Sequence, residues 1–360
     1  MAEKVKSSAT ATLTPPPLAP VPALRAASAQ IQAVPLPRRL AGGRAVAIAV
    51  LIGVGVVLPF MLQNFYIFQL TLAMVYAIAL IGLNMLVGYN GQISLGHGAL
   101  YAIGAYIAAI LMNSFDWPYW LSVWPAGVVC LVFGYFFGLP ALRLQGHYLA
   151  LASLALAVTT PQVLKHKALE EWTGGFSGIV LNKPDVPFGL PIDQDQWLYF
   201  FVYAIMLVLF LIAYNLLRGR IGRAMIAIRD QPIAAEAMGI NSAIIKTSTF
   251  GVSAFYTGVA GALSAIVVQF VSPDSYDFFL SITLLVGIAV GGFATISGAL
   301  YGALFILLVP NFAGELSKSA PWAIYGVLLI LVMYFMPTGF AGLVRRIGTR
   351  LTILVNRPSA

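Results

Sequence analysis

The chain has 360 residues, of which 60% are hydrophobic and 9% are charged, and its mean hydropathy is +0.90. A soluble domain carries about a quarter charged residues, so this composition excludes a soluble globular enzyme. The net charge of +8 could suggest a nucleic-acid partner, but the basic residues lie beside and between apolar runs. In that position Lys and Arg orient a chain in a membrane. We therefore expect an all-α polytopic membrane protein with no nucleic acid among its partners.

The first 44 residues differ from the rest of the chain in composition. They are rich in Ala and Ser and end in a basic stretch that leads into an apolar run. Seven prolines are spread through them, namely Pro15, Pro16, Pro17, Pro20, Pro22, Pro35 and Pro37. Such a segment cannot bury enough apolar surface to fold. It has no apolar core followed by a small-residue cleavage site, so we expect a disordered cytoplasmic segment rather than a signal peptide.

Charge-free stretches then predict a transmembrane domain over residues 45–344. Ala45 to Phe115 contains no Asp, Glu, Lys or Arg, and its 71 residues suffice for three spans of about 20 residues each. In the 278–314 stretch, glycines favour two helices, the second one short. About ten spans are predicted, near 46–62, 66–87, 94–112, 120–141, 147–164, 197–217, 247–270, 279–296, 299–312 and 322–342. A basic tail, 345–360, follows.

The distribution of basic residues predicts the orientation of these spans. With ten spans, one side holds 1–44, Arg143, 218–246 and 345–360, which together carry 16 Lys and Arg and three acids. The opposite side holds four lysines and nine acids. Because excess Lys and Arg marks the cytoplasmic side, both termini are predicted to be cytoplasmic.

Two polar segments between the spans are long enough to bind a partner, an outer one over 165–196 and an inner one over 218–246. In the inner segment, Asp230 is a candidate N-cap, Pro232 suits a first helical turn, and Gly239 suits a C-terminal stop. This predicts a two-turn helix lying along the membrane surface. A helix that short is marginal in water and needs a partner surface. The alternative is a solvated basic linker that only fixes orientation.

A glycine- and amide-rich stretch over 84–99 interrupts the second and third spans. Non-helical backbone at membrane depth is tolerated where it is buried in protein or lines a cavity. A broken helix can also direct free N–H groups at a carboxylate. We take Gly88, Asn90, Gly91, Gln92, Ser94, Gly96 and His97 as candidates for the substrate pathway. The alternatives are that the glycines serve close helix packing, that the stretch is a surface turn, and that His97 is structural.

A later stretch repeats part of this pattern. Val87-Gly88 and Ile93-Ser94 align with Val290-Gly291 and Ile296-Ser297 at a constant offset of 203 residues. If the likeness is a true repeat, both copies bend on the same side of the membrane, as in a parallel repeat. Gly291, Gly292 and Ser297 therefore join the candidate pathway residues.

Some chemistries have no support in the sequence. The chain has one cysteine, Cys130, and its three histidines have no ligand-like spacing, so no metal site is expected. No phosphate-binding loop, zinc-protease motif or nucleophile elbow is present. The predicted spans contain no carboxylate, which argues against proton coupling through an in-membrane acid.

The ordered set of motifs resembles the permease subunits of branched-chain amino acid ABC importers, of the LivM-like rather than the LivH-like type. The likeness covers about residues 65–343. Its motifs are Gly88-Tyr89-Asn90-Gly91-Gln92-Ile93-Ser94-Leu95-Gly96-His97, Thr173-Gly174-Gly175-Phe176-Ser177-Gly178-Ile179, Gly222-Arg223-Ala224 with Ala227-Ile228-Arg229-Asp230, Ala234-Ala235-Glu236-Ala237-Met238-Gly239, Ser272-Pro273-Asp274, and Gly291-Gly292 with Gly298-Ala299.

The resemblance implies a multi-pass protein of the bacterial inner membrane that works without catalysis of its own. Its implied partners are a second homologous permease, two cytoplasmic ABC ATPases that bind the ATP, and a soluble substrate-binding protein that meets the outer loop. The inner segment would be the coupling helix seated on an ATPase. The residues that match the family's coupling segment are Arg223, Arg229, Asp230, Ala234, Ala235, Glu236 and Gly239.

Other functions stay open at this stage. Relatives within the wider family carry urea, short amides or aromatic acids, and the binding protein usually sets this choice. A stand-alone channel or secondary carrier would fit the spans equally well. A polytopic membrane enzyme is a further alternative, although the chain offers only one polar cluster, Lys165, His166, Lys167, Glu170 and Glu171.

Overall fold

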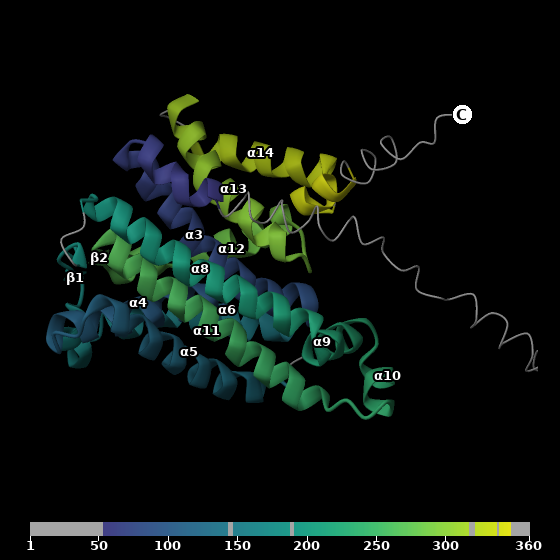
Figure 1. Ribbon diagram of the computed structural model, residues 1–360. Helices are drawn as coiled ribbons and strands as arrows, with labels where there is room; N and C mark the ends of the chain where they lie inside the picture. The colour runs from purple at the N-terminus through teal and green to yellow at the C-terminus, as the bar shows by residue number, and fades with distance from the viewer. Residues whose placement is uncertain (1–52, 143–146, 188–190, 317–320, 337, 347–360) are drawn as a thin grey trace, which may run out of the picture. The chain divides into compact units, whose positions relative to one another are not determined.

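A computed structural model describes residues 53–142, 147–187, 191–316, 321–336 and 338–346 (Figure 1). The N-terminal segment 1–44 and most of the tail 345–360 lie outside these residues. The described residues from Leu58 onward form one compact unit. Residues 53–61 are helical and occupy the described part of the first predicted span.

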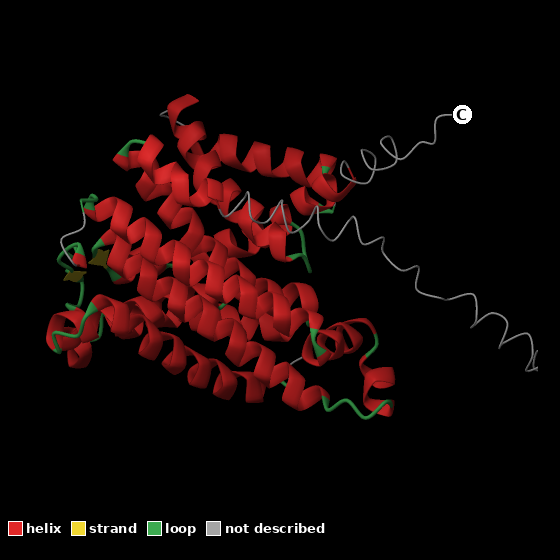
Figure 2. Cartoon of the chain, viewed as in Figure 1, coloured by secondary structure: helices red, strands yellow, loops and turns green. Residues whose placement is uncertain are grey.

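The described chain is almost entirely helical, as Figure 2 shows. The long helices are α3 (Asn64–Asn84), α4 (His97–Ser114), α5 (Tyr119–Ala141), α6 (His147–Leu164), α8 (Gln194–Arg218), α11 (Ser242–Val268), α12 (Phe278–Gly291), α13 (Ile296–Leu316) and α14 (Pro321–Phe335). Shorter helices are η1 (Met85–Tyr89), η2 (Lys167–Leu169), α7 (Glu170–Thr173), α9 (Arg220–Asp230), α10 (Pro232–Ala237) and η4 (Pro273–Tyr276). Two short strands, β1 (Ile179–Val180) and β2 (Phe270–Val271), complete the fold.

Five of the described helices are long and apolar enough to cross a membrane. They are α3 continued by η1, α5, α8, α11 and α13. Two bent helix pairs raise the number to seven when each pair is counted as one span. Helix α12, with 14 residues, is apolar but shorter than the about 20 residues of a typical span.

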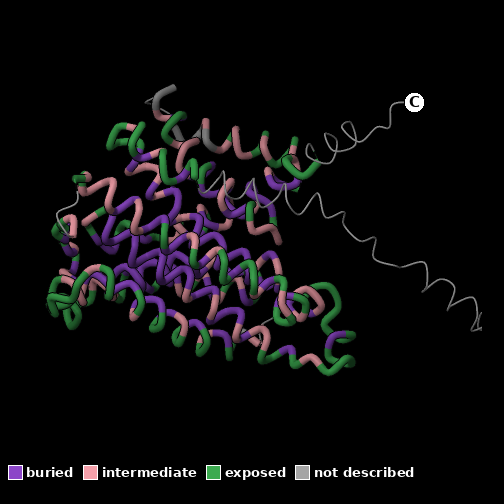
Figure 3. The backbone as a smooth tube through the Cα atoms, in the orientation of Figure 1, coloured by how far each residue is buried: buried purple, intermediate pink, exposed green. Residues whose placement is uncertain are grey.

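Helix α11 forms the centre of the bundle and packs against α3, α4 and α5 (Figures 1 and 3). Its small residues explain this position, because they let neighbouring backbones approach closely. A β-carbon on Gly82 of α3 would lie 2.7 Å from the carbonyl oxygen of Ser253. Gly104 of α4 packs directly on Gly258, and Gly134 of α5 packs on Ala254. By contrast, the outward face of α5 carries Trp120, Val128 and Phe136, as expected for a helix that faces lipid.

Three sequence predictions about helix boundaries are wrong. In the 278–314 stretch, the first helix is the short one, because the break falls at Gly292–Thr295 rather than near Ser297. The span predicted over 322–342 ends at Phe335, and a second helix begins at Gly339, whose φ is +71°. In the inner segment, α9 precedes the predicted short helix, and α11 begins at Ser242, which leaves less loop than predicted.

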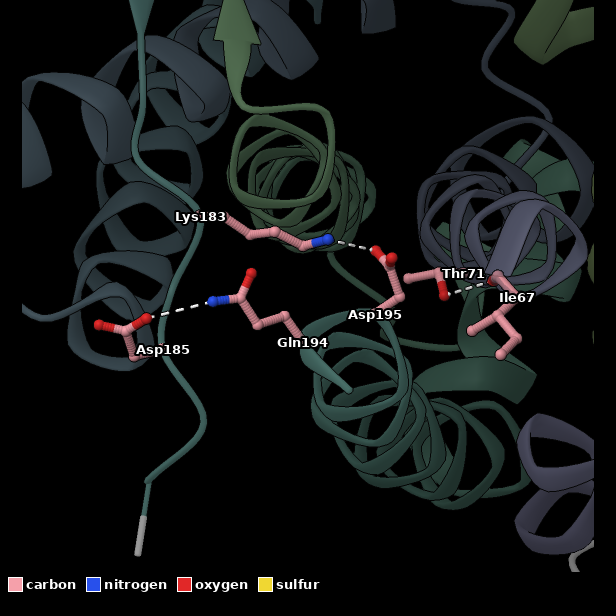
Figure 4. A network of polar contacts seen from close by, with 6 residues as sticks. All are labelled: Ile67, Thr71, Lys183, Asp185, Gln194 and Asp195. Carbon is pink, nitrogen blue, oxygen red and sulfur yellow. Dashed lines mark hydrogen bonds and ion pairs between the residues drawn. The ribbon is translucent and has the colours of Figure 1, made fainter. Parts of the chain in front are cut away.

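The two ends of the bundle differ in structure. At one end, called here the β-pair end, β1 and β2 pair antiparallel with Ile179 opposite Val271. This pairing ties the 165–196 segment to the end of α11. Two polar contacts tie the same segment to α8, as Figure 4 shows: Lys183 Nζ lies 2.7 Å from Asp195 Oδ1, and Gln194 Nε2 donates to Asp185 Oδ1. The other end carries α9 and α10 and is called here the α10 end (Figure 1).

Candidate functional site

The first candidate region is the break between η1 and α4, residues 90–96. Helix α3 passes into a π-helical turn at Met85–Tyr89, and the chain then runs without helical structure to His97. Gln92 Nε2 donates to the carbonyl of Lys246, and His97 contacts Ser253 on the same helix, α11. Seven helical residues separate these two contacts, a rise of about 10 Å. The break therefore runs along α11, with Gln92 and Ser94 buried and Gly91 and Ile93 exposed.

His97, directly after this break, connects helices α3, α4 and α11. Its ring is fully buried, and the nitrogens lie 3.0 Å from Ser94 Oγ and 2.7 Å from Ser253 Oγ. Ser253 uses its single hydroxyl proton on the carbonyl of Gly82, 2.6 Å away. Nε2–H of His97 must therefore donate to Ser253, which leaves Nδ1 to accept from Ser94. With both ring nitrogens satisfied, His97 holds α4 to α3 and α11 in this conformation.

The other candidates in the break have different surroundings. Gly96 packs against the backbone of Ser153 on α6. A β-carbon added to Gly96 would lie 2.8 Å from the carbonyl oxygen of Ser153, so close packing excludes a larger residue there. Gly91 is exposed and has a φ of +72°, which favours glycine. Asn90 is 2% exposed, yet neither polar atom of its side chain has a hydrogen-bond partner. A buried amide without partners is uncommon, so Asn90 has both a donor and an acceptor available for a polar group.

The second candidate region is the break between α12 and α13, residues Gly292–Thr295. Gly291 packs directly against the backbone of Gly298, which folds the two helices sharply onto each other. Gly292 has a φ of +117°, and Gly339 packs against it from the last helix. Ser297, a predicted pathway residue, is exposed in the first turn of α13. The sequence echo between 87–94 and 290–297 therefore falls on two real breaks in helices.

The end of α3, shortly before the first break, contacts the second break through Asn84. Its Nδ2 donates to the carbonyl of Thr295 at 2.8 Å, and its Oδ1 accepts from the N–H of Ala294 at 2.9 Å. Sequence reasoning did not select Asn84, although it stands inside the quoted glycine- and amide-rich stretch. The sequence feature that could have identified Asn84 is a polar side chain within an otherwise apolar span. Polar side chains in such spans are rare and usually pair with another polar group. Ser253, also a polar residue within an apolar span, was not selected either.

The α9–α10 segment is the third candidate region. Asp230 was predicted as the N-cap of the short helix, but it is the last residue of α9, and Gln231 occupies the cap. Pro232 begins α10 as predicted. Gly239 follows it with a φ of +82°, where it donates to the carbonyl of Glu236 while Ile240 donates to that of Ala235. These two bonds form a Schellman motif, which fixes the end of a very short helix.

Most residues of this segment face away from the bundle. Arg223, Asp230, Ala234 and Glu236 are exposed, whereas Ala235 is buried against its neighbours. Two apolar side chains of the segment, Ile233 and Met238, are each 83% exposed. Arg229 is the exception among the charged residues, because its Nη1 reaches inward and donates to the carbonyl of Gly88 at 2.7 Å. The segment thus joins an exposed apolar surface to the helical turn that precedes the first break.

Within the described residues, no group of three or more His, Cys, Asp or Glu side chains is placed to hold a metal ion. Two residues of the polar cluster at 165–171 make separate contacts. Lys165 forms an ion pair with Asp274 of η4, and His166 accepts from the backbone N–H of Ala168. These contacts join segments of the β-pair end.

Comparison with known proteins places these features in a family. Residues 65–337 match the permease component of branched-chain amino acid transport systems. The chain belongs to this family. The match spans α3 to the end of α14 and so includes both breaks and the α9–α10 segment.

Individual relatives have the same character. The high-affinity branched-chain amino acid transport system permease protein LivM of Escherichia coli is 31% identical over 310 residues, 80% of this chain and 72% of its own. BraD of Pseudomonas aeruginosa, described in the same terms, is 30% identical over 293 residues, 76% of this chain and 93% of its own. LivH of Escherichia coli is 29% identical over 293 residues, 76% of this chain and 92% of its own. No solved structure matches the chain.

Proposed function

We propose that this permease moves branched-chain or related amino acids across the bacterial inner membrane, with energy from two cytoplasmic ABC ATPases. ATP would bind to those partners, and this chain would have no catalytic role. The observation that carries the proposal is α10. It ends in a fixed Schellman motif and presents Ile233 and Met238 to solvent. Exposed apolar side chains on a rigid helix favour a protein partner over a solvated linker.

The charge of the α10 end supports its placement on the cytoplasmic side. Arg218, Arg220, Arg223, Arg229 and Lys246 lie in or next to the α9–α10 segment, with only Asp230 and Glu236 as acids. The β-pair end is rich in acids. We therefore propose ten spans with both termini cytoplasmic, which makes α12 and α13 two separate segments of the membrane domain.

Three further partners follow from the same proposal. A second homologous permease would complete the membrane unit, lipid would cover faces such as the apolar side of α5, and a soluble binding protein would dock on the β-pair end. That end is rigid enough to receive a protein, because the β pair and the Lys165–Asp274 ion pair connect its segments. The substrate pathway would run beside the breaks at 90–96 and 292–295, where Asn90 offers an unpartnered amide.

The cargo is proposed from the relatives, whose names specify branched-chain amino acids. Urea, short amides and aromatic acids are the alternative cargo for the same type of importer. A stand-alone channel or secondary carrier is the alternative mechanism, and α10 argues against it, because such a protein has no use for an exposed apolar helix on its surface.

The first experiment is purification of the chain from its native membranes in a mild detergent, with mass spectrometry of what accompanies it. We expect two ATPases and a second permease. Recovery of the chain alone, in a detergent that preserves other ABC complexes, would overturn the proposal in favour of a channel or carrier. The accompanying binding protein is then titrated with leucine, urea and an aromatic acid to identify the cargo.

Variants of α10 test the contact itself. Ile233→Asp and Met238→Asp should abolish co-purification of the ATPases, because each places a charge in the proposed apolar contact. Glu236→Lys and Gly239→Pro should uncouple uptake while the chain remains folded in the membrane. The matched control is Val180→Asp, because Val180 is an apolar residue of similar exposure, 72%, at the β-pair end. Normal ATPase recovery with Ile233→Asp and with Met238→Asp would show that α10 is not part of the interface.

A further inference from the structure

Arg229 is the link between the α9–α10 segment and the membrane helices. It is the next-to-last residue of α9, and 34% of its side chain is exposed. Its Nε donates to Asp230 Oδ1 at 2.9 Å, and its Nη1 donates to the carbonyl of Gly88 at 2.7 Å. The aliphatic part of the side chain packs against Gly91. A β-carbon added to Gly91 would lie only 2.7 Å from Arg229 Cγ. Arg229 therefore contacts both sides of the point where the first break begins.

Gly88 lies at the carboxyl end of the helix that it helps to terminate. The last carbonyls of a helix have no partner within the helix, and a nearby cation is favourable there. The guanidinium of Arg229 supplies both a hydrogen bond and a charge at this point. A side chain on Gly88 would overlap Asn84 Oδ1 and the backbone nitrogen of Ala294. Gly88 is therefore in contact with Arg229 on one side and with the second break on the other.

Asn84 lies one turn before Gly88 on the same helix and is 2% exposed. Its amide makes the two complementary bonds to Ala294 and Thr295 described above. Ala294 has a φ of +54°, a left-handed conformation that is unfavourable for a residue other than glycine. A conformation of this kind persists only when its surroundings hold it in place. Asn84 contributes by accepting from the N–H of Ala294 and donating to the carbonyl of the next residue, Thr295.

We propose that Arg229 and Asn84 are positioning residues that transmit movement of α10 to the break between α12 and α13. Displacement of the α9–α10 segment pulls on the carbonyl of Gly88, and the end of α3 moves with it. Asn84 carries this movement to Ala294 and Thr295, which lie 57 and 58 residues beyond the end of α10 in the sequence. This inference rests on the proposed function, because it needs an ATPase to move α10.

The test uses the complete complex, reconstituted in proteoliposomes, and measures leucine transported per ATP hydrolysed. Asn84→Asp removes the donor to Thr295 and keeps the size of the side chain. Arg229→Met keeps the contact with Gly91 and removes the donor to Gly88. For each we expect wild-type recovery of partner subunits, continued ATP hydrolysis, and about a tenfold fall in leucine per ATP, the effect of one lost hydrogen bond at a buried partner on a two-state equilibrium.

Two comparisons separate transmission from mere structural support. Arg229→Lys restores a charged donor and should recover much of the ratio lost in Arg229→Met. The double variant with Asn84→Asp should be no worse than the more severe single variant, because both residues act in one path. Asn84→Ser, which is smaller and leaves no strain, replaces Asn84→Asp if that variant fails to fold.

The matched control is Asn311→Asp in α13. Asn311 Nδ2 donates to a backbone carbonyl, that of Leu307, at 3.0 Å, but it is exposed and the bond stays within one helix. Leucine per ATP should not change. A wild-type ratio in both Asn84→Asp and Arg229→Met, or losses that multiply in the double variant, would overturn the relay. Failure of the wild-type chain to recover ATPases would instead overturn the proposed function.

Discussion

The two breaks share a local sequence pattern but are held open in different ways. The break at 90–96 is seven residues long and is fixed by side chains from other helices, with Ser253 and Ser153 as partners of His97 and Leu95. The break at Gly292–Thr295 is shorter and is closed mainly by backbone against backbone, with Gly291 on Gly298 and Gly339 on Gly292. Only Asn84 adds side-chain hydrogen bonds from another element to its backbone among the described contacts.

This difference indicates how each break can respond to force. A break held by several buried hydrogen bonds resists movement, because each lost partner leaves an unsatisfied group. A break held by glycine contacts and one amide can shift when that amide shifts. In the proposed relay, the second break would therefore follow a movement of Asn84 more readily than the stretch 90–96 would change its own contacts.

The largest expected effect comes from the glycine contact of the second break. Gly291→Leu forces a side chain into the backbone of Gly298, and overpacking of this kind costs about 3 kcal/mol. We expect loss of monodisperse protein in size-exclusion chromatography and a lower thermal midpoint in detergent. Gly314→Leu is the control, because Gly314 lies in the same helix pair with open space around it. Equal behaviour of the two variants would show that the glycine contact does not hold the break.

The next effect tests the side-chain contacts of the first break. His97→Leu leaves Ser94 and Ser253 without their ring partner, and an unsatisfied buried group costs about 1–3 kcal/mol. The thermal midpoint in detergent should fall clearly, while His166→Leu, at an exposed position, should change it little. An unchanged midpoint for His97→Leu would mean that packing alone holds the 90–96 stretch.

A smaller effect separates backbone strain from the Arg229 contact. Gly91→Ala and Gly239→Ala both place a β-carbon at a positive φ, which costs about 1–2 kcal/mol. Gly91 in addition meets Arg229, whereas Gly239 has open space. We expect Gly91→Ala to lower leucine uptake more than its stability loss explains, and the larger Gly91→Leu to block uptake. Wild-type uptake with Gly91→Leu would make this stretch a passive connection.

The smallest effect is expected far from both breaks. Lys183→Ala removes the ion pair with Asp195 at the β-pair end, and a partly exposed pair of this kind contributes about 1 kcal/mol or less. The thermal midpoint should fall slightly at low salt and hardly at all at high salt, because the charges are then screened. A large loss at both salt concentrations would indicate that the β-pair end stabilises the whole bundle.

The amino-acid sequence by itself determined the class of protein, the positions of most helices, and the short helix of the α9–α10 segment. The reason is local, since apolar length, proline and glycine act within one element and are readable in order along the chain. Helix α6 has the predicted bounds, and Gly239 ends α10 as predicted. The candidate regions were also found this way, because a glycine- and amide-rich stretch is unusual between apolar spans.

Only the tertiary structure decided which residues meet. Asp230 looked like an N-cap until α9 was seen to continue through it, and the short helix of the 278–314 stretch proved to be the first, because the contact of Gly291 with Gly298 sets the break. No local sequence pattern identifies the hydrogen-bond partners of Asn84 and Ser253, which lie 210 and 156 residues away in the chain. Partner choice depends on how helices stack in three dimensions, and spacing along a single chain does not encode it.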